Sequence, residues 1–425
     1  MKLLLTKIKK NFAGVIHLLF WVTFLTAFGC DSPAKKAENK QPAFDLSFVD
    51  GSNGLPATEQ WRQGLSFHDM NGDGNVDIVS TPPRDASAET KNLFIWHGNG
   101  KGEWSAFPLL NVPDSFVSNY GTVVASDFSG DGIPDIAAAM HGSGLRALKG
   151  AKNGKYLEFS KGMPSGTKFL ARALVSADLN HDGVEDLAAV SEFSPKMGPS
   201  SYGGLLACFS RDGQWQCNPI GDPKETAGLV ADVIVAGDVN ADGNIDLGVS
   251  SRNSQRSLIV WLGDGKGNFK PFNKGLATGI HYGSVSFADV NNDGRDDLVA
   301  SISGRGKDYK GLKVFLSTPE GFMDNSSEGL PSGEEWSYFA SAGDLNGDGN
   351  VEIVAATKEG GLKIYEQRKG QWHELRVSGL PDKGLYRVYG LYCIDVNKDG
   401  RKDIAVIHSN AHEKTGGINV YLTEQ

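Results

Sequence analysis

One acidic segment of nine residues recurs seven times along the chain, and it constrains the fold more than any other feature of the sequence. The first copy reads DMNGDGNVD at residues 69–77, and neighbouring copies start 51 to 60 residues apart. The copies begin at Asp69, Asp127, Asp178, Asp238, Asp289, Asp344 and Asp395. A length of 425 residues alone would suggest two or three domains. A self-similar period of roughly 50 residues instead indicates a repeat architecture.

Each acidic segment lies between two runs that have the composition of β-strands. In the fifth copy, SVSFA at 284–288 leads into the segment and DLVAS at 297–301 leaves it. A third apolar run follows, such as LIVWL at 258–262, and a fourth opens on an aromatic residue, such as Phe269. Short β-branched runs bounded by Gly, Asn and Asp are typical of strands. Four strands in each of seven units predict an all-β, seven-bladed β-propeller with four-stranded blades over residues 43–425.

The two ends of the repeat region indicate how the ring closes. The seventh unit stops after its third strand, at 417–422, and residues 44–56 resemble the stretch at 322–331 that leads into the sixth acidic segment. We therefore expect the N-terminal strand to supply the missing fourth strand of the last blade. That closure would remove an open sheet edge.

Oxygen donors alternate through each acidic segment in the way that a hard cation requires. Positions 1 and 5 are always Asp, position 3 is Asn in six copies and Ser in one, and position 9 is Asp in six copies and Glu in one. Position 7 varies, as expected if it offers only its backbone carbonyl. Because Ca²⁺ takes about six to eight oxygen ligands, we predict structural calcium in up to seven loops. The alternative is a set of tight turns, but turns do not need three carboxylates per copy, which would repel one another without a cation.

The predicted calcium ligands occupy positions 1, 3, 5, 7 and 9 of each copy. They are Asp69, Asn71, Asp73, Asn75 and Asp77; Asp127, Ser129, Asp131, Ile133 and Asp135; Asp178, Asn180, Asp182, Val184 and Asp186; Asp238, Asn240, Asp242, Asn244 and Asp246; Asp289, Asn291, Asp293, Arg295 and Asp297; Asp344, Asn346, Asp348, Asn350 and Glu352; and Asp395, Asn397, Asp399, Arg401 and Asp403.

These segments, together with GNGKGEW at 98–104 and GDGKGNF at 263–269, resemble FG-GAP/VCBS repeats, which are similar to the calcium-loop blades of integrin α-subunit propellers. The resemblance spans residues 43–425 and implies a propeller that binds calcium. It does not imply one function, because the family includes adhesins, polysaccharide-active enzymes and many exported proteins.

The N-terminus has the features of an export signal. A basic stretch that ends at Lys10 precedes an apolar run from Phe12 to Phe28, and Cys30 follows in a sequence similar to a bacterial lipobox. We predict a lipoprotein signal peptide at 1–29, lipidation of Cys30 and a flexible tether at 30–42, so that the protein is exported and membrane-anchored, facing the periplasm or the cell exterior. The alternative is an uncleaved membrane anchor.

Two further cysteines flank a predicted hairpin. Cys208 and Cys217 lie symmetrically about the turn at Asp212-Gly213, which places them opposite each other on neighbouring strands. An exported protein permits a cross-strand disulfide there. The alternative is a pair of free thiols.

The face opposite the acidic loops is the candidate ligand surface. Variable segments at 81–92, 192–203, 303–311 and 408–416 lie there, and aromatic residues and arginines precede the innermost strands. The candidate ligand-binding residues are Trp61, Arg62, Tyr120, Arg172, His281, Tyr282, Trp336, Tyr338, Arg387 and Tyr389. Arginines pair with carboxylates or sulfates, and aromatic rings stack on sugars. The alternative is that these aromatics fill contacts between blades and that the arginines form salt bridges between blades.

Two classes of function follow. The first is a monomeric binding or adhesion module for a glycan or protein ligand. The second is a lyase or hydrolase acting on an anionic polysaccharide at the channel mouth, for which His281, Tyr282, Arg387 and Tyr389 are the first candidates for base and charge neutraliser. We favour binding, because the sequence shows no nucleophile motif, phosphate loop or transition-metal cluster.

The charge of the chain gives no indication of a basic partner. The formal net charge is −9, and loss of the four lysines in the leader would make it −13. Seven Ca²⁺ ions would bring this to about +1. The acidity therefore reflects the predicted metal ligands, and we expect no nucleic-acid partner.

Overall fold

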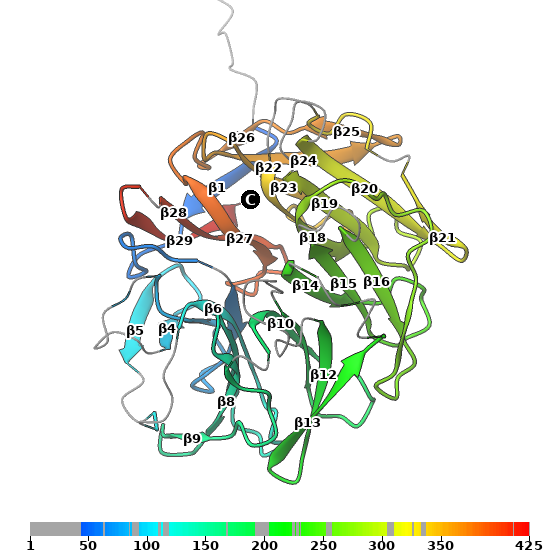
Figure 1. The fold of residues 1–425 in the computed structure, drawn as a ribbon. Coiled ribbons are helices and arrows are strands. Elements are labelled where there is room, and N and C mark those ends of the chain that lie inside the picture. The colour runs from blue at the N-terminus through cyan, green and yellow to red at the C-terminus, as the bar shows by residue number, and fades with distance from the viewer. Residues whose placement is uncertain are drawn as a thin grey trace, which may run out of the picture. The chain divides into compact units, whose positions relative to one another are not determined.

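Seven β-sheets are arranged around a central axis in the computed structural model of the chain (Figure 1). The structure describes residues 44–424, except for positions 63, 85, 87–92, 109–111, 114–118, 167–168, 192–203, 223–225, 227–228, 230, 252–256, 304–309, 325–326, 333–336 and 411. The predicted all-β propeller is confirmed. The predicted signal peptide, the tether and Cys30 lie outside the described residues. No helix in the described part is long and apolar enough to cross a membrane.

Six of the sheets are four-stranded blades whose strands pair in chain order. The blades are β2 (Leu65–His68), β3 (Asp77–Ser80), β4 (Phe94–Gly98) and β5 (Trp104–Pro108); β6 (Gly121–Ser126), β7 (Asp135–Met140), β8 (Gly144–Gly150) and β9 (Tyr156–Glu158); β10 (Ala171–Ala177), β11 (Asp186–Ser191), β12 (Leu205–Arg211) and β13 (Gln214–Ile220); β14 (Ala231–Gly237), β15 (Asp246–Ser251), β16 (Leu258–Gly263) and β17 (Phe269–Pro271); β18 (Tyr282–Ala288), β19 (Asp297–Ser303), β20 (Lys310–Thr318) and β21 (Gly321–Met323); and β22 (Ser337–Gly343), β23 (Glu352–Thr357), β24 (Leu362–Arg368) and β25 (Gln371–Glu374).

The seventh blade joins the two ends of the repeat region, as predicted. It contains β27 (Arg387–Ile394), β28 (Asp403–Asn410), β29 (Thr415–Glu424) and the N-terminal strand β1 (Leu46–Asp50). β1 pairs antiparallel with β29, with Ser47 opposite Glu424. A short strand, β26 (Val377–Ser378), adds to the outer edge of β1 in parallel, which the sequence did not predict.

The hydrophobic core is divided into seven clusters, and each cluster lies between two adjacent blades. The cluster that joins the last blade to the first contains Ile78 and Trp96 from the first and Ile407 and Val420 from the last. Burying one such side chain contributes about 1.5–3 kcal/mol. Each blade is therefore stabilised mainly by its neighbours, which makes ring closure a condition for stability.

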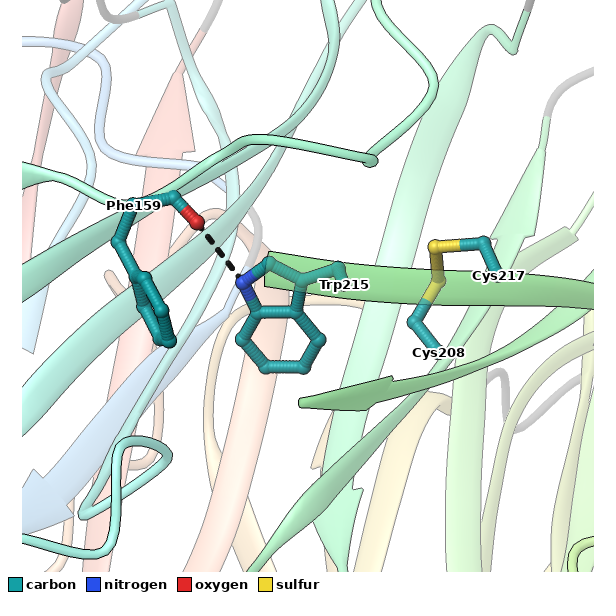
Figure 2. The surroundings of a disulfide bond; sticks show 4 residues. All are labelled: Phe159, Cys208, Trp215 and Cys217. Carbon is teal, nitrogen blue, oxygen red and sulfur yellow. Dashed lines mark hydrogen bonds between the residues drawn. A yellow bond between two sulfur atoms is a disulfide. The ribbon is translucent and has the colours of Figure 1, made fainter. Parts of the chain in front are cut away.

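In five blades of the described structure, an aromatic residue of the fourth strand contacts the segment that arrives from the preceding blade. Trp215 of β13 donates its backbone N–H to the carbonyl of Lys161 (2.8 Å) and its indole Nε1–H to the carbonyl of Phe159 (2.9 Å), as Figure 2 shows for the indole. The chain passes beneath this strand at Gly162, with φ +94°, where a Cβ would lie 1.9 Å from the Trp215 carbonyl oxygen. Only glycine fits such a position. The same contact recurs between Gly54 and Trp104, Gly275 and Phe322, Gly329 and Trp372, and Gly379 and Phe48.

The two cysteines of the hairpin lie where the sequence places them. Cys208 of β12 and Cys217 of β13 are directly opposite in the strand register and are joined by a disulfide bond (Figure 2). The bond ties the two outer strands of the third blade together, on the same strand that carries Trp215. It therefore supports the strand that fastens the second blade to the third.

Candidate functional site

Each acidic loop is folded around the carboxylate at its first position. We number the loops 1 to 7 in chain order, and each joins the first strand of a blade to the second. In loop 1, Asp69 Oδ1 accepts a hydrogen bond from the backbone N–H of Gly72 and Asp69 Oδ2 accepts one from Gly74, both at 2.8 Å. The bond from the N–H at position 6 to position 1 recurs in all seven loops, at 2.6–3.0 Å. Position 6 can donate inward because glycine adopts the left-handed conformation there, with φ +87° at Gly74.

The side chains at positions 3 and 5 also accept hydrogen bonds from backbone N–H groups of their own loop. Asn71 Oδ1 accepts from the N–H of Asp73, and Asp73 Oδ1 accepts from the N–H of Asn75, both at 2.8 Å. The bond to position 5 recurs in all seven loops. The bond to position 3 recurs in every loop except loop 2. The backbone of each loop thus fixes the orientation of its own oxygen donors.

The carboxylate at position 9 is the first residue of the second strand and is at most 1% exposed in every blade. In the fourth blade, Asp246 accepts from the N–H of Val239 in the loop (3.0 Å) and from the N–H of Gly263 in the third strand (2.8 Å). It therefore ties the loop to two strands. Burial raises the pKa of Asp135 and Asp403 to about 6. Burial raises the pKa of Asp186, Asp246, Asp297 and Glu352 to about 7.

These loops offer a donor set that fits a hard cation such as Ca²⁺. Within the described residues, no group of three or more His, Cys, Asp or Glu side chains is by itself arranged to hold a metal ion. The donors of a loop instead include an amide oxygen and a backbone carbonyl beside the carboxylates, which is the mixture that Ca²⁺ accepts. Asp186 Oδ1 is buried and has no hydrogen-bond donor among the described residues. An ionised carboxylate in that setting needs a positive charge nearby.

Loop 2 differs from the other six loops. Its position 3 is Ser129, whose Oγ lies 3.5 Å from Asp127 Oδ1. The Nζ of Lys149, on β8, lies 2.9 Å from Asp131 Oδ2 at position 5. The Lys149 ammonium is the largest cause of a lowered pKa at Asp131. In loop 2, a side chain of the protein therefore supplies positive charge to one of the predicted calcium ligands.

Among the described residues, two other loops also have a basic side chain beside the carboxylate at position 5. Arg295 Nη1 lies 3.7 Å from Asp293 Oδ2 in loop 5, and Arg401 Nη2 lies 2.7 Å from Asp399 Oδ2 in loop 7. These arginines belong to the loops themselves, whereas Lys149 reaches loop 2 from the third strand.

The first blade also has a basic residue on its third strand. His97 occupies the same register position on β4 as Lys149 does on β8, and His97 Nδ1 lies 3.0 Å from Asp77 Oδ2. In contrast to Lys149, it contacts position 9 rather than position 5. The sequence did not single out either residue, because the contact depends on the register of the third strand.

Neighbouring loops contact one another around most of the ring. His181 of loop 3 bonds to Asn244 of loop 4 (3.0 Å), and Asn292 of loop 5 donates to Asn350 of loop 6 (2.9 Å). The other junctions are between Asp296 and Asp238, between Lys402 and Asp344, and between Lys398 and Gly74. These bonds link loops 3, 4, 5, 6, 7 and 1 in a continuous series. The acidic face is therefore a connected frame rather than seven separate turns.

On the opposite face, two predicted ligand residues are part of the core, so that prediction was wrong. Trp61 is 2% exposed, packs edge-on against Phe94 and Trp96, and donates its indole N–H to the carbonyl of Thr58 (2.7 Å). Tyr282 is 1% exposed, and burial raises the pKa of its hydroxyl. Neither side chain reaches a ligand on the surface, and Tyr282 is excluded as a catalytic base. The aromatic side chains were selected for composition, and here they fill blade contacts.

The remaining candidates divide into two groups. Arg172 is paired with Asp232 of the next blade, with Nε 2.5 Å from Oδ1, so it forms a salt bridge between blades. His281 is half-buried beside β18. Trp336 lies outside the described residues, and the structure does not describe the side chain of Tyr338. The others, from the last, first and second blades, lie together.

Arginines and tyrosines gather where the last blade meets the first. The Cζ atoms of Arg62 and Arg387 each lie 4.9 Å from the centre of the Tyr389 ring. Arg84 lies 5.8 Å from the centre of the Tyr120 ring, and that ring stacks on His141 at 4.9 Å. We call Arg62, Arg84, Tyr120, Arg387 and Tyr389 the arginine–tyrosine cluster. Arg84 was not among the candidates, although it follows two prolines in a segment that the sequence placed on this face.

The cluster adjoins the central channel. The seven innermost strands enclose a cavity of about 370 Å³, lined mostly by side chains such as Val123, Ile234 and Leu391, and Tyr389 is part of its wall. The channel is therefore narrow and mainly apolar, while charged groups stand at the start of the innermost strand β27. A ligand would meet the cluster before it reached the channel.

Solved structures similar to this chain have the same type of fold. Two of them are crystal structures of BBS1N in complex with ARL6DN, one soaked with lead and the other with mercury. Their TM-scores are 0.54 and 0.53, at 13% sequence identity, and the matches cover 89% of this chain and 97% of the other. No curated protein sequence matches the chain.

The sequence matches a family model for the FG-GAP-like repeat in four segments, at residues 69–138, 127–189, 231–300 and 344–406. The first two segments overlap, and the other two are separate. Each segment contains at least one acidic loop and the strands around it. Since the four segments together cover more than half of a propeller built from such units, this chain belongs to the FG-GAP-like repeat family.

Proposed function

We propose that the protein is a calcium-stabilised binding module, anchored to a membrane outside the cytoplasm, that holds a protein ligand on the face opposite the acidic loops. The observation that carries the proposal is the arginine–tyrosine cluster, which brings side chains of three blades together beside the central channel. Tyrosine and arginine are enriched among the residues that dominate protein–protein binding. The scaffold behind them is rigid, as loop-borne binding residues require.

Calcium has a structural role in this proposal. Every loop already orders its own donors through backbone hydrogen bonds, and six of the position 9 carboxyls have a pKa raised by burial. Calcium supplies the positive charge that keeps these groups ionised. Loops 1 and 3 to 7 have the full set of donors. Loop 2 is the exception, because Ser129 replaces the amide donor at position 3 and Lys149 of the third strand contacts Asp131.

The proposal of a membrane anchor is supported by the sequence alone. The leader at 1–29 and the lipobox-like position of Cys30 support export and lipidation, and the polar residues at 30–42 would let the propeller stand away from the bilayer. Replacement of Cys30 by alanine should move the protein from the membrane fraction to the soluble fraction. Retention in the membrane fraction would favour an uncleaved anchor.

A protein ligand is preferred over a glycan. In both similar structures, the propeller BBS1N is in complex with a second protein, ARL6DN. The enzyme alternative has lost one of its candidate groups, because Tyr282 is in the core. A glycan ligand or an adhesive role remains compatible with exposed tyrosines and arginines, and the binding experiment separates these possibilities.

Calcium is tested by chelation. Ligands that bind only the folded state stabilise it by about 4 kcal/mol per site at a thousandfold excess over the dissociation constant. Removing calcium with EDTA should therefore lower the thermal midpoint by roughly 5 °C or more, and Ca²⁺ but not Mg²⁺ should restore it. An unchanged thermal midpoint in EDTA would contradict the proposed structural role of calcium.

The ligand face is tested by site-specific photo-crosslinking on intact cells. A crosslinker at Tyr389, in the cluster, is compared with one at Leu157, which is 53% exposed on the outer strand of the second blade. Adducts that form from Tyr389 alone and that are removed by protease indicate a protein ligand on this face. Adducts removed by glycosidase indicate a glycan, and equal adducts from both positions contradict the assignment of the face.

A further inference from the structure

Arg62 is a buried cation without a carboxylate partner in the described part of the structure. Arg62 is only 8% exposed to solvent. Its guanidinium donates to Ser409 Oγ (3.3 Å) and to Gln60 Oε1 (3.1 Å), both of which are uncharged. Burying a charge is costly unless an opposite charge compensates it. Hydroxyl and amide oxygens orient the guanidinium but leave its charge uncompensated.

Two further guanidiniums and two tyrosine rings surround Arg62. Burial lowers the pKa of Arg62, and the nearby guanidiniums of Arg84 and Arg387 lower it further. Arg387 is exposed and lies over the same Tyr389 ring as Arg62. The ring face attracts both cations by about 0.5–2 kcal/mol each. The ring therefore attracts two like charges, each with its Cζ atom 4.9 Å from the ring centre.

Arg172, another of the predicted ligand residues, has a structural role and serves as a comparison for Arg62. Arg172 is bound to the carboxylate of Asp232 at 2.5 Å, which joins the third blade to the fourth. Arg62 lies just before the innermost strand of its blade, whereas Arg172 is the second residue of β10, and Arg62 is bound to Gln60 and Ser409. The difference indicates that the counter-charge of Arg62 comes from outside the described residues.

We propose that Arg62 and Arg387, held over Tyr389, form a carboxylate-binding site, and that its ligand is an acidic segment of the partner protein. The inference rests on the proposed binding function and narrows it to one chemical class. Guanidinium groups bind carboxylates through paired N–H···O bonds. The half-buried ring of Tyr120 lies in the same cluster, stacked on His141 and with Arg84 over it, so a third guanidinium stands near the site.

The test uses the full-length protein in detergent and three fluorescent probes: a hexaglutamate peptide, a hexaglutamine peptide and trigalacturonate. Fluorescence polarisation measures binding to wild type, Arg62→Met, Arg387→Met and the matched control Arg172→Met. Methionine keeps much of the apolar stem and removes the charge. Arg387 is exposed, so its variant reports on binding even if the Arg62 variant folds poorly.

Hexaglutamate should bind at least tenfold more tightly than hexaglutamine, and its affinity should fall as salt is added. Arg62→Met and Arg387→Met should each weaken it at least fivefold, while Arg172→Met should stay within twofold of wild type. Equal affinity for the two peptides, equal loss in all three variants, or stronger binding of trigalacturonate would overturn the proposal. If Arg387→Met keeps full peptide affinity while Tyr389 still forms protein adducts, the binding function stands and the carboxylate site falls.

Discussion

The two faces of this propeller handle charge in opposite ways. On the acidic face, the carboxylates at positions 1 and 5 bond to the backbone of their own loop, within five residues, and the pattern is repeated from blade to blade. On the opposite face, charged side chains reach across blades, as Arg62 does to Ser409 and Arg172 does to Asp232. The first arrangement is set by local sequence and builds the scaffold. The second depends on which blades the ring places side by side, and it can differ at every junction.

The largest expected effect comes from the acidic face, and it is the pH dependence of the free energy of unfolding of the metal-free protein. The raised pKa values of the position 9 carboxyls mean that the folded state holds more protons than the unfolded state between about pH 4 and 7. That contribution to stability is complete at low pH and is lost as the pH rises through about 6 to 7. One unit of raised pKa corresponds to about 1.4 kcal/mol, so six such groups should change the free energy of unfolding by several kcal/mol.

Thermal midpoints in EDTA should therefore fall from pH 5 to pH 8. With calcium the sign should reverse, because protons compete with the metal for the same oxygens and the gain from calcium is lost as the pH falls. Parallel profiles with and without calcium would mean that the position 9 carboxylates do not hold the ion.

Substitution of Gly162 should give the next largest effect, at a junction between blades. Gly162→Ala places a Cβ 1.9 Å from the carbonyl oxygen of Trp215 and keeps a φ of +94° that alanine rarely adopts. We expect a loss of about 3 kcal/mol or more in the free energy of unfolding, measured by urea denaturation. Gly154→Ala is the control: φ is +69° there, but nothing lies within 4 Å of the new Cβ. It should cost only about 1 kcal/mol, and equal losses would contradict the clash.

The contrast between the faces also explains how much could be predicted from the sequence. The blade count, the four strands of each blade, ring closure by β1 and the pairing of Cys208 with Cys217 depend on local patterns and on their repetition. The roles of Trp61 and Tyr282 depend on the neighbouring blade, so their composition alone was misleading. Lys149 and Arg84 were missed for the same reason, because only the strand register and the ring bring them to their partners.

Loop 2 is the acidic loop in which position 3 is Ser129 and a lysine of the third strand, Lys149, contacts the carboxylate at position 5. Lys149→Ala should cost at most about 1 kcal/mol in calcium-free buffer, because the ion pair is partly exposed. It should also add one calcium ion to the number bound per chain, measured by equilibrium dialysis, whereas Lys155→Ala on the same blade should not. Seven ions bound to the wild type would show that the ammonium does not replace calcium in loop 2.

The smallest effect on stability is expected at the exposed arginine of the ligand face. Arg387→Met removes a charge from a solvated position and leaves the strand register of β27 unchanged, so the free energy of unfolding should shift by less than about 0.5 kcal/mol. The lost attraction to the Tyr389 ring, on the order of 0.5 kcal/mol, and the relieved repulsion from Arg62 act in opposite directions. Urea denaturation at low and high salt measures the net shift, because salt screens the repulsion between the two guanidiniums. A loss above about 1 kcal/mol, independent of salt, would mean that Arg387 supports the blade as Arg172 does, and the two faces would then differ less than their contacts indicate.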